Sequence, residues 1–273
     1  MTAARATLEL ALIQLNAGTD VQANLTRALV LAEQAFQAGA EFVLLPENFA
    51  YMGPDHGRLA VAERLPNGPL VSAFAALARR FQGYLLLGGI PEVSPEPPRT
   101  YNTAVLLDPS GACLAYYRKL HLFDVTLNTG ASYRESSAVL PGTDLVTASV
   151  HGWSVGLSIC YDLRFPELYR ALSARGVDVV TVPAAFTART GEAHWEPLLR
   201  ARAIENLCYV AAPGQWGQHG RQQTFGHSMV VSPWGEVLAT LADGEGVVRQ
   251  TLQRERLHAA RRELPCLSHR RLG

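Results

Sequence analysis

Hydrophobic positions along the chain form short continuous runs that alternate with segments of helical spacing. The run TLELALIQLN at 7–16 is an apolar-rich strand candidate. The run EFVLLPE at 41–47 is continuously apolar, which is typical of a strand covered on both faces. Between them, the apolar residues of segment 20–39 recur at helical spacing. Asp20 is the predicted N-cap of this helix and Gly39 its predicted stop.

The same alternation continues to the end of the chain. It predicts helices, strands and hairpins in this order: helix 69–82, strand 84–93, hairpin 103–122, strand 153–160, helix 165–176, strand 177–186, helix 194–208, strand 209–216 and hairpin 226–241. Strands alternating with helices, with hairpins between them, predict an α/β fold with mixed sheets. No change of composition marks a linker, so we expect residues 1–273 to form a single domain.

Composition and charge exclude several classes of protein. The chain is 48% hydrophobic, enough for one large core, and its 24 basic residues balance 24 acidic ones. This balance predicts no nucleic-acid partner. No run is long and apolar enough to span a membrane, and the N-terminus lacks the features of a secretory signal. The cysteines are widely spaced, without zinc-ligand spacing, so we expect no metal and a reducing, cytoplasmic location.

The stretch SICYDLRFPE places Cys160 between an apolar run and the start of a predicted helix. A lone cysteine in this context is most often an inert core residue. Two further strand-like segments end in chemically useful side chains, Glu47 and Lys119. Taken singly, this glutamate could be a helix cap and this lysine a solvated surface residue. Their joint occurrence at strand ends instead favours a functional site.

A cysteine nucleophile needs both a base and a cation nearby. A free thiol at neutral pH is only slightly ionised, so a carboxylate such as that of Glu47 can take its proton during attack. An ammonium such as that of Lys119 favours the thiolate and stabilises the oxyanion formed when sulfur adds to a carbonyl. If the helix predicted from 165 begins close to Cys160, its N-terminus would favour the same negative charge.

Three ordered motifs carry a resemblance to a known family. LLPENF at 44–49, YRKLHLFD at 117–124 and GLSICYDLRFPEL at 156–168 resemble, in order and spacing, the motifs of the nitrilase superfamily of carbon–nitrogen hydrolases. The resemblance covers nearly the whole chain. It implies a four-layer α-β-β-α sandwich, a homodimer, and hydrolysis without a metal or organic cofactor.

The resemblance also implies a role for particular residues. Glu47 would be the general base and later the general acid, Lys119 the oxyanion-stabilising cation, and Cys160 the nucleophile. Glu135, in the segment SYRES, would orient the lysine; its alternative is a solvated loop carboxylate. The backbone N–H of Tyr161 would contribute to the oxyanion site.

Longer segments narrow the resemblance to a branch of the superfamily. The segments 122–142, 185–210 and 226–239 are most similar to the deaminated glutathione amidases. This similarity implies a small-molecule amide substrate with a 2-oxo acid end, cleaved through a thioester to 2-oxoglutarate and cysteinylglycine. The alternatives are an omega-amidase acting on 2-oxoglutaramate, which shares several of these motifs, and a catalytically silent binding protein on the same fold.

Substrate-binding residues are predicted by the same resemblance. Arg164 would face the 2-oxo acid end, where its planar guanidinium suits a bidentate grip on a carboxylate. Its alternative is a structural ion pair with Asp162 or Glu167. Phe186 and Thr190, in the loop after the strand predicted at 177–186, are further pocket candidates.

Other reactive side chains are predicted to be structural. His121 and His227 suggest a cysteine–histidine pair, but in this superfamily a carboxylate transfers the proton. His194 and Trp195 are expected to begin a helix and to serve in packing and capping. The remaining cysteines lie in apolar contexts and are expected to be inert: Cys113, Cys208 and Cys266.

Overall fold

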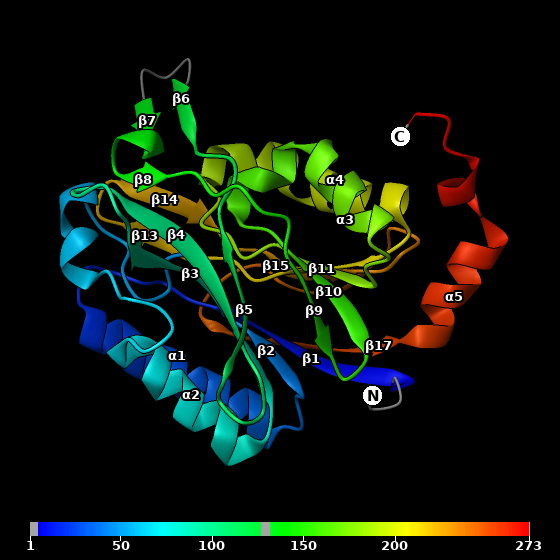
Figure 1. Cartoon of the computed structure of the whole chain (residues 1–273), viewed down its shortest axis with the longest axis horizontal. Coiled ribbons are helices and arrows are strands. Elements are labelled where there is room, and N and C mark those ends of the chain that lie inside the picture. The colour runs from blue at the N-terminus through cyan, green and yellow to red at the C-terminus, as the bar shows by residue number, and fades with distance from the viewer. Residues whose placement is uncertain (1–4, 127–131, 273) are drawn as a thin grey trace.

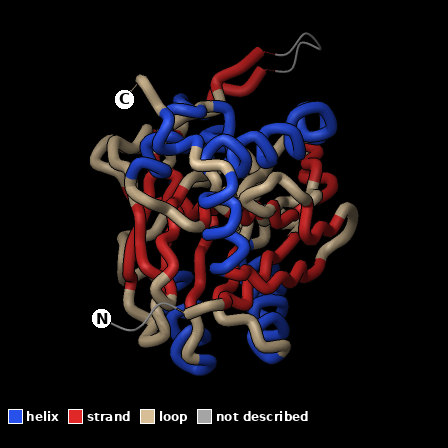
Figure 2. The backbone as a smooth tube through the Cα atoms, turned by 90° about the vertical axis from the view of Figure 1, so that its right-hand side faces the viewer, coloured by secondary structure: helices blue, strands red, loops and turns tan. Residues whose placement is uncertain are grey.

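The computed structural model describes residues 5–126 and 132–272 of the chain. Two β-sheets pack face to face, and helices cover the outer face of each sheet (Figure 1). Turned by a right angle, the same layers follow one another as helix, strand, strand and helix (Figure 2). The predicted four-layer α-β-β-α sandwich is therefore confirmed.

The first sheet has seven strands and mixed directions. Its order is β17-β1-β2-β3-β4-β5, and β8 pairs with β4. Strands β1, β2 and β3 run parallel, β17 is antiparallel to β1, and β4 is antiparallel to β3 and β5 but parallel to β8. Their bounds are β1 Thr7–Gln14, β2 Phe42–Leu44, β3 Tyr84–Val93, β4 Thr100–Leu107, β5 Cys113–Arg118, β8 Val139–Leu140 and β17 Gly246–Gln253.

The second sheet has six strands in the order β16-β15-β12-β11-β10-β9. Its three central strands are parallel, and an antiparallel hairpin closes one end while β9 closes the other. Their bounds are β9 Thr147–Val150, β10 Trp153–Leu157, β11 Val179–Thr181, β12 Tyr209–Ala212, β15 Ser228–Val231 and β16 Val237–Leu241.

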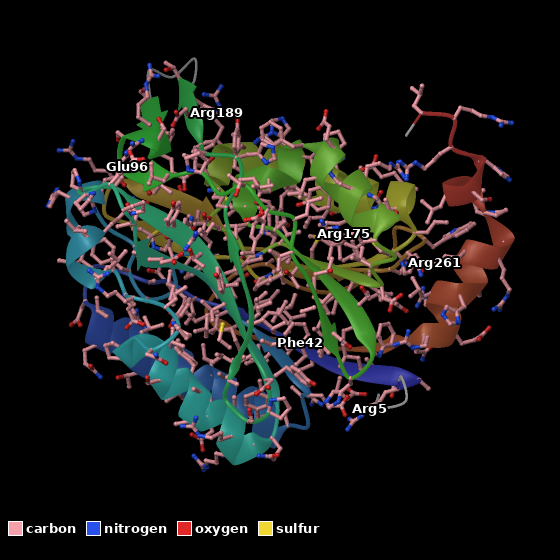
Figure 3. The ribbon with its side chains drawn as sticks, viewed as in Figure 1. Arg5, Phe42, Glu96, Arg175, Arg189 and Arg261 are labelled. Carbon is pink, nitrogen blue, oxygen red and sulfur yellow. The ribbon has the colours of Figure 1, made fainter. Side chains whose placement is uncertain are left out.

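The continuous apolar runs are explained by burial on both faces of each sheet. Alternate residues of β1, such as Leu10 and Leu12, pack into the core between the sheets, together with Phe42. The residues between them, such as Ala11 and Ile13, pack under the helices instead. Phe42 lies deep among the side chains near the middle of the molecule (Figure 3). A strand enclosed in this way has no polar face to produce alternation.

In the part of the chain that the structure describes, four helices form the two outer layers, and a fifth lies at one end of the sandwich. Helices α1 (Val21–Gln37) and α2 (Pro69–Phe81) cover the first sheet, and α3 (Pro166–Ala174) and α4 (Ala188–Asn206) cover the second. The predicted N-cap of α1 is confirmed, because Asp20 accepts a hydrogen bond from the backbone N–H of Ala23. Helix α5 (Arg254–Glu263) and the C-terminal segment lie at one end of the sandwich (Figure 1). No helix within the described ranges is long and apolar enough to cross a membrane.

The start of α4 corrects one prediction. His194 and Trp195 do not begin this helix, because it starts at Ala188 and places them in its second turn. The apolar spacing does not show the first turn, which contains Gly191. A Cβ at Gly191 would lie 2.3 Å from Phe225, so the close packing of this turn requires glycine. Tertiary packing therefore decides this boundary, not local spacing.

The remaining elements are short hairpins and 3₁₀ turns. Two small hairpins, β6–β7 and β13–β14, lie outside the main sheets. The bounds of the short elements are β6 Asp124–Thr126, β7 Ser132–Arg134, β13 Trp216–His219, β14 Gln222–Phe225, and the 3₁₀ turns η1 Asp55–Gly57, η2 Leu59–Val61, η3 Glu135–Ser137, η4 Cys160–Arg164 and η5 Cys266–His269. Residues 127–131 of the branch-specific segment 122–142 lie outside the described residues.

Candidate active site

Segments that follow strands of both sheets meet in one cavity. Glu47 follows β2, Lys119 follows β5, and Cys160 follows β10, so each lies just beyond the end of a strand. Glu135 begins the turn η3 after the β6–β7 hairpin. The structure brings all four side chains to the lining of this cavity. Residues separated by up to 113 positions along the chain thus become neighbours.

Lys119 lies at the centre of the cluster and is only 2% exposed. Its Nζ donates to Glu47 Oε1 at 3.0 Å and to both carboxylate oxygens of Glu135, at 3.0 and 2.9 Å. The Phe123 backbone N–H donates to Glu135 Oε2 at 2.7 Å. Glu135 is therefore tied to the lysine, and the alternative of a freely solvated loop carboxylate does not describe its position.

Glu47 is fixed from three further directions. Asn102 Nδ2 donates to its Oε1 at 2.8 Å, and the Ala185 backbone N–H donates to its Oε2 at 2.8 Å. Gln215 Nε2 donates to the backbone carbonyl of the same residue at 3.0 Å. A carboxylate held by this many donors has one orientation, which is what proton transfer to and from a defined atom requires.

Burial and charge set the protonation states of the cluster. Burial would raise the pKa of Glu47, but the Lys119 charge together with hydrogen bonds from Cys160, Lys119 and the Ala185 N–H outweighs it and holds the pKa below its ordinary value. Burial would lower the pKa of Lys119, but Glu135 and Glu47 raise it well above normal. For Cys160, burial and the adjacent Glu47 carboxylate raise the thiol pKa well above normal, despite an opposing effect of Lys119. At neutral pH Glu47 is therefore ionised, Lys119 is an ammonium and Cys160 is a protonated thiol.

The backbone around Cys160 has an unusual conformation. Cys160 has a positive φ of 49°, a left-handed conformation that side chains with a Cβ rarely adopt. Its N–H donates to the Pro183 carbonyl at 2.9 Å, which ties this turn to the segment after β11. Such strain persists where the surroundings over-determine the conformation, and it is common at functional sites. Because Pro166 begins α3, Cys160 opens the separate turn η4 instead of lying at the first turn of that helix.

A buried carboxylate, that of Asp162, holds the nucleophile turn in place. Its Oδ2 accepts from the Ile159 backbone N–H at 2.9 Å and from the Tyr117 hydroxyl at 2.7 Å. Its Oδ1 accepts from the backbone N–H of His121 at 3.0 Å and contacts the ring Nδ1 of that residue at 2.7 Å. Asp162 therefore links the Cys160 turn to the segment that carries Lys119.

The predicted substrate-binding residues also line the cavity. Tyr161, Arg164, Phe186 and Thr190 are all part of its wall. Within the described residues, the backbone N–H of Tyr161 donates to no protein acceptor, so it is available to a ligand. Thr190 shares a hydroxyl hydrogen bond of 2.7 Å with Thr187.

Arg164 does not form either of the ion pairs considered as its alternative role. Within the part of the chain that the structure describes, Arg164 forms no salt bridge with Asp162 or Glu167. Its guanidinium contacts His194 Nδ1 at 3.3 Å and lies 5.2 Å from the ring centroid of Phe186. A cation packed against a ring, without a carboxylate partner, can accept a substrate carboxylate.

Several residues of the site were not identified from the sequence as parts of it, and three of them are instructive. Asn102 lies in the polar first half of β4 and is fully buried, which requires a polar partner nearby. Asp162 was considered only as an ion-pair partner. Arg58 lies in a loop without any distinctive pattern, and only the structure places it in the cavity wall.

The other histidines and cysteines do not line the cavity. His121 stacks on Phe165, and His227 stacks on Phe225, each with its ring Nδ1 engaged by an oxygen. Three cysteines lie elsewhere and are unpaired: Cys113, Cys208 and Cys266. Across residues 5–126 and 132–272, no three His, Cys, Asp or Glu side chains are grouped in a way that could hold a metal ion.

Comparison with known proteins agrees with this geometry. The family model described as carbon–nitrogen hydrolase matches residues 9–262. The chain is a carbon–nitrogen hydrolase. This hydrolase is 45% identical over 264 residues to a deaminated glutathione amidase of Synechocystis, with 95% of this chain and 97% of that protein covered. The nitrilase-superfamily membership predicted from the three motifs is thus confirmed.

Solved structures share the fold of this hydrolase. The NitFhit protein of C. elegans superposes with a TM-score of 0.90 and 35% identity, over 98% of this chain and 66% of that chain. Nit3 of Saccharomyces cerevisiae, described as a member of branch 10 of the nitrilase superfamily, superposes with a TM-score of 0.89 and 30% identity, over 98% of each chain. The chain is therefore an enzyme of the amidase type within this superfamily.

Proposed function

We propose that this enzyme hydrolyses the amide of deaminated glutathione to 2-oxoglutarate and cysteinylglycine. The main observation is one cavity lined by two kinds of group. We call the cluster of Glu47, Lys119, Glu135 and Cys160 the base of the cavity and its other lining residues the wall. The wall contains guanidinium groups without a carboxylate partner among the described residues. Such walls suit an anionic substrate. The 45% identity to the Synechocystis deaminated glutathione amidase supports the same substrate.

In the first half of the reaction, Cys160 Sγ attacks the amide carbonyl carbon while Glu47 takes the thiol proton. Because the pKa of the thiol is raised and that of Glu47 is lowered, the proton leaves sulfur only as the C–S bond forms. Lys119 and the Tyr161 N–H stabilise the oxyanion. The C–N bond then breaks, Glu47 gives its proton to the departing amine, and a thioester remains.

In the second half, water attacks the thioester carbonyl and Glu47 takes a proton from it. The same two donors stabilise the second oxyanion. When this intermediate collapses, the C–S bond breaks and Glu47 returns the proton to sulfur. Glu135 holds Lys119 in place throughout, through its two contacts with Nζ. No redox step or external cofactor is needed to balance these steps.

Arg164 is proposed to bind the 2-oxo acid end of the substrate. Its guanidinium lies against Phe186, which leaves its N–H donors available to a carboxylate. Phe186 and Thr190 complete this part of the wall. The acyl group would then extend from Arg164 to Cys160, four residues away in the same turn.

Intact-mass measurement after brief exposure to deaminated glutathione tests the nucleophile. We expect a 2-oxoglutaryl adduct on the wild-type enzyme that peptide mapping assigns to Cys160. The Cys160→Ala variant should give neither adduct nor hydrolysis. Cys266→Ser is the matched control, because this cysteine lies outside the cavity. An adduct that persists in Cys160→Ala would contradict the assignment.

Comparative kinetics test the substrate. The omega-amidase alternative predicts that 2-oxoglutaramate, which shares the acyl group but releases ammonia, is hydrolysed with the higher kcat/KM. The proposed function predicts the higher kcat/KM for deaminated glutathione, with overlap because the acyl group is common. A clear preference for the simple amide would exclude the proposed function while leaving the cysteine mechanism intact.

Assembly and location belong to the same proposal. We infer a homodimer, formed through α3 and the C-terminal segment, where Leu264 and Leu272 are exposed. Sedimentation of the purified enzyme tests the dimer, and a monomer at micromolar concentration would contradict it. Four cysteines without disulfide partners are compatible with the proposed cytoplasmic location.

A further inference from the structure

The cavity wall contains a buried guanidinium that the proposed mechanism does not use. Arg58 lines the same cavity as Cys160 and is only 8% exposed. Its Nη1 donates to Asn48 Oδ1 at 3.2 Å, and its Nε and Nη2 have no hydrogen-bond partner. Among the described residues Arg58 forms no salt bridge and lies over no aromatic ring.

The other buried arginine shows how unusual this is. Arg202 is 5% exposed, and each of its three side-chain nitrogens donates to a partner. Two of these nitrogens donate to the Leu163 carbonyl, and the third pairs with Glu205. Arg202 thus has a structural role that accounts for its burial. Arg58 lacks such a role within the parts of the chain that the structure describes.

Nearby carboxylates do not supply the missing partner. Glu63 accepts from the backbone N–H groups of Leu70 and Val71 at the start of α2, so it serves that helix. Asp55 lines the cavity but is not within salt-bridge distance of Arg58. A buried charge without a counter-ion is costly, because the protein does not replace the water it loses. A carboxylate entering the cavity would offset that cost.

The loop that carries Arg58 is held in a defined shape. The Tyr51 hydroxyl donates to the Pro54 carbonyl at 3.0 Å, and the chain turns tightly around this side chain. A Cβ at Gly57 would lie 1.9 Å from the same hydroxyl, so the Tyr51 side chain packs directly against the backbone just before Arg58. The guanidinium is therefore presented by a fixed turn and not by an extended surface loop.

Arg58 and Arg164 come from different halves of the sandwich. Arg58 lies in the connection after β2 of the first sheet, whereas Arg164 ends the turn after β10 of the second sheet. Both line one cavity, with the Cys160 cluster at its base. Outside that cluster the lining contains three arginines and one aspartate, a net charge of +2. This charge matches a substrate with two carboxylates.

We propose that Arg58 binds a carboxylate on the leaving group of the substrate. Resting on the proposed function, this assigns Arg164 to the 2-oxo acid end and Arg58 to the C-terminal carboxylate of the departing dipeptide. The substrate class is then an amide between a 2-oxo diacid and an amine that carries its own carboxylate. Arg58 would be the residue that separates this class from simple primary amides.

The test compares two variants on three substrates. Arg58→Gln and Arg134→Gln, which removes the competing candidate in the same wall, an exposed arginine, are each assayed with deaminated glutathione, its C-terminal carboxamide and 2-oxoglutaramate. For wild type we expect the carboxamide to have a kcat/KM lower than the free acid by roughly 10- to 100-fold. Arg58→Gln should lose a similar factor on the free acid.

Combining the substitution in the enzyme with the change in the substrate makes the test specific. Arg58→Gln should hydrolyse the free acid and the carboxamide about equally, because the two changes remove the same contact. Its loss on 2-oxoglutaramate should be at least tenfold smaller than its loss on deaminated glutathione. Arg58→Lys should restore part of the preference for the free acid, since an ammonium binds a carboxylate without the bidentate geometry.

Three results would overturn the proposal. The first is equal turnover of free acid and carboxamide by the wild-type enzyme, which needs no variant to fold. The second is an unchanged preference for the free acid in Arg58→Gln, and the third is loss of that preference in Arg134→Gln instead. If wild type prefers 2-oxoglutaramate, the proposed function fails together with this assignment. If wild type prefers deaminated glutathione and only the carboxamide comparison fails, the proposed function stands and the role of Arg58 is wrong.

Discussion

The base of the cavity and its wall are built differently. At the base, Lys119 is almost fully buried and contacts three carboxylate oxygens, and Glu47 accepts hydrogen bonds from several elements. In the wall, Arg58 makes one hydrogen bond of 3.2 Å, and Arg164 contacts a histidine nitrogen and aromatic rings. The charges of the base are paired within the protein, whereas Arg58 and Arg164 in the wall have no carboxylate partner among the described residues.

This difference separates chemistry from specificity. Groups whose charges are already compensated keep one geometry with or without substrate, as a preorganised reaction centre requires. A guanidinium that lacks a carboxylate partner can form charge-assisted hydrogen bonds with a substrate carboxylate, and these bonds favour binding. Substitutions at the base should therefore lower kcat for every substrate, and those in the wall should act on particular parts of the substrate.

Replacing Lys119 with Met should have the largest effect. The variant removes the only ammonium of the cluster and leaves Glu47 and Glu135 facing each other without a cation. We expect a loss of kcat of at least about 10³-fold, and a loss of stability of about 3 kcal/mol because a buried pair is broken. Rate assays and chemical denaturation check both. Full activity in this variant would contradict the proposed role of Lys119 as the cation of the cluster.

Comparing Glu47→Gln with Glu135→Gln distinguishes the roles of the two carboxylates of the cluster. Both carboxylates contact Lys119, but only Glu47 interacts with the Cys160 thiol. Loss of the general base should lower kcat by roughly 10²- to 10⁴-fold in Glu47→Gln. Glu135→Gln retains that base and should lose less. Rapid-quench measurement of acylation decides the order, and the reverse ranking would contradict the proposed roles.

Asp162→Asn should weaken the support of the nucleophile turn without removing a reacting group. An amide presents a donor where Asp162 now accepts from the Ile159 N–H and the Tyr117 hydroxyl. We expect a stability loss of about 1–3 kcal/mol and a fall in kcat of roughly 10- to 100-fold through misplacement of sulfur. Asp178→Asn is the control, since it removes a buried ion pair outside the cavity. A similar fall in kcat in the control would show that Asp162 acts only through stability.

Arg164→Gln should raise KM about tenfold for both 2-oxo acid substrates, because each carries the carboxylate that this residue is proposed to bind. This pattern differs from that of Arg58→Gln, which should affect only the substrate with a charged leaving group. Arg189→Gln serves as the control, because Arg189 is exposed on α4 and does not line the cavity (Figure 3). An effect confined to one of the two substrates would contradict the assignment of Arg164.

The smallest expected effect is that of pH near neutrality. The pKa of Glu47 is held below its ordinary value of 4.5, and that of Cys160 is raised well above 9.0. Glu47 is thus ionised and the thiol protonated throughout, and kcat/KM should be nearly constant from about pH 6 to about pH 8. Because the folded pKa of Glu47 is lowered, its contribution to stability is present above 4.5 and is lost as the pH falls below that value. A rate profile with a midpoint near 7 would indicate a histidine base instead.

The order of elements and the chemical residues could be read from the sequence. The continuous apolar run 41–47 predicted a strand buried on both faces, and Phe42 and Val43 of β2 indeed pack on opposite sides of the first sheet. Polar side chains that follow such runs stand out, which is why Glu47, Lys119 and Cys160 could be named as candidates. The catalytic roles of these residues stay predictions.

Other features depended on contacts between distant segments, and no local pattern records them. The first turn of α4 is set by the packing of Gly191 on Phe225, and the left-handed conformation of Cys160 is supported by a bond to Pro183. A loop position such as Arg58 has no periodicity that marks it as buried. The apolar pattern alone determined the alternation of strands and helices, the family resemblance supplied the four layers, and the strand-end side chains indicated the residues capable of chemistry. Only the tertiary structure decided which of them are paired and which are left for a ligand, because pairing depends on distances across the two sheets.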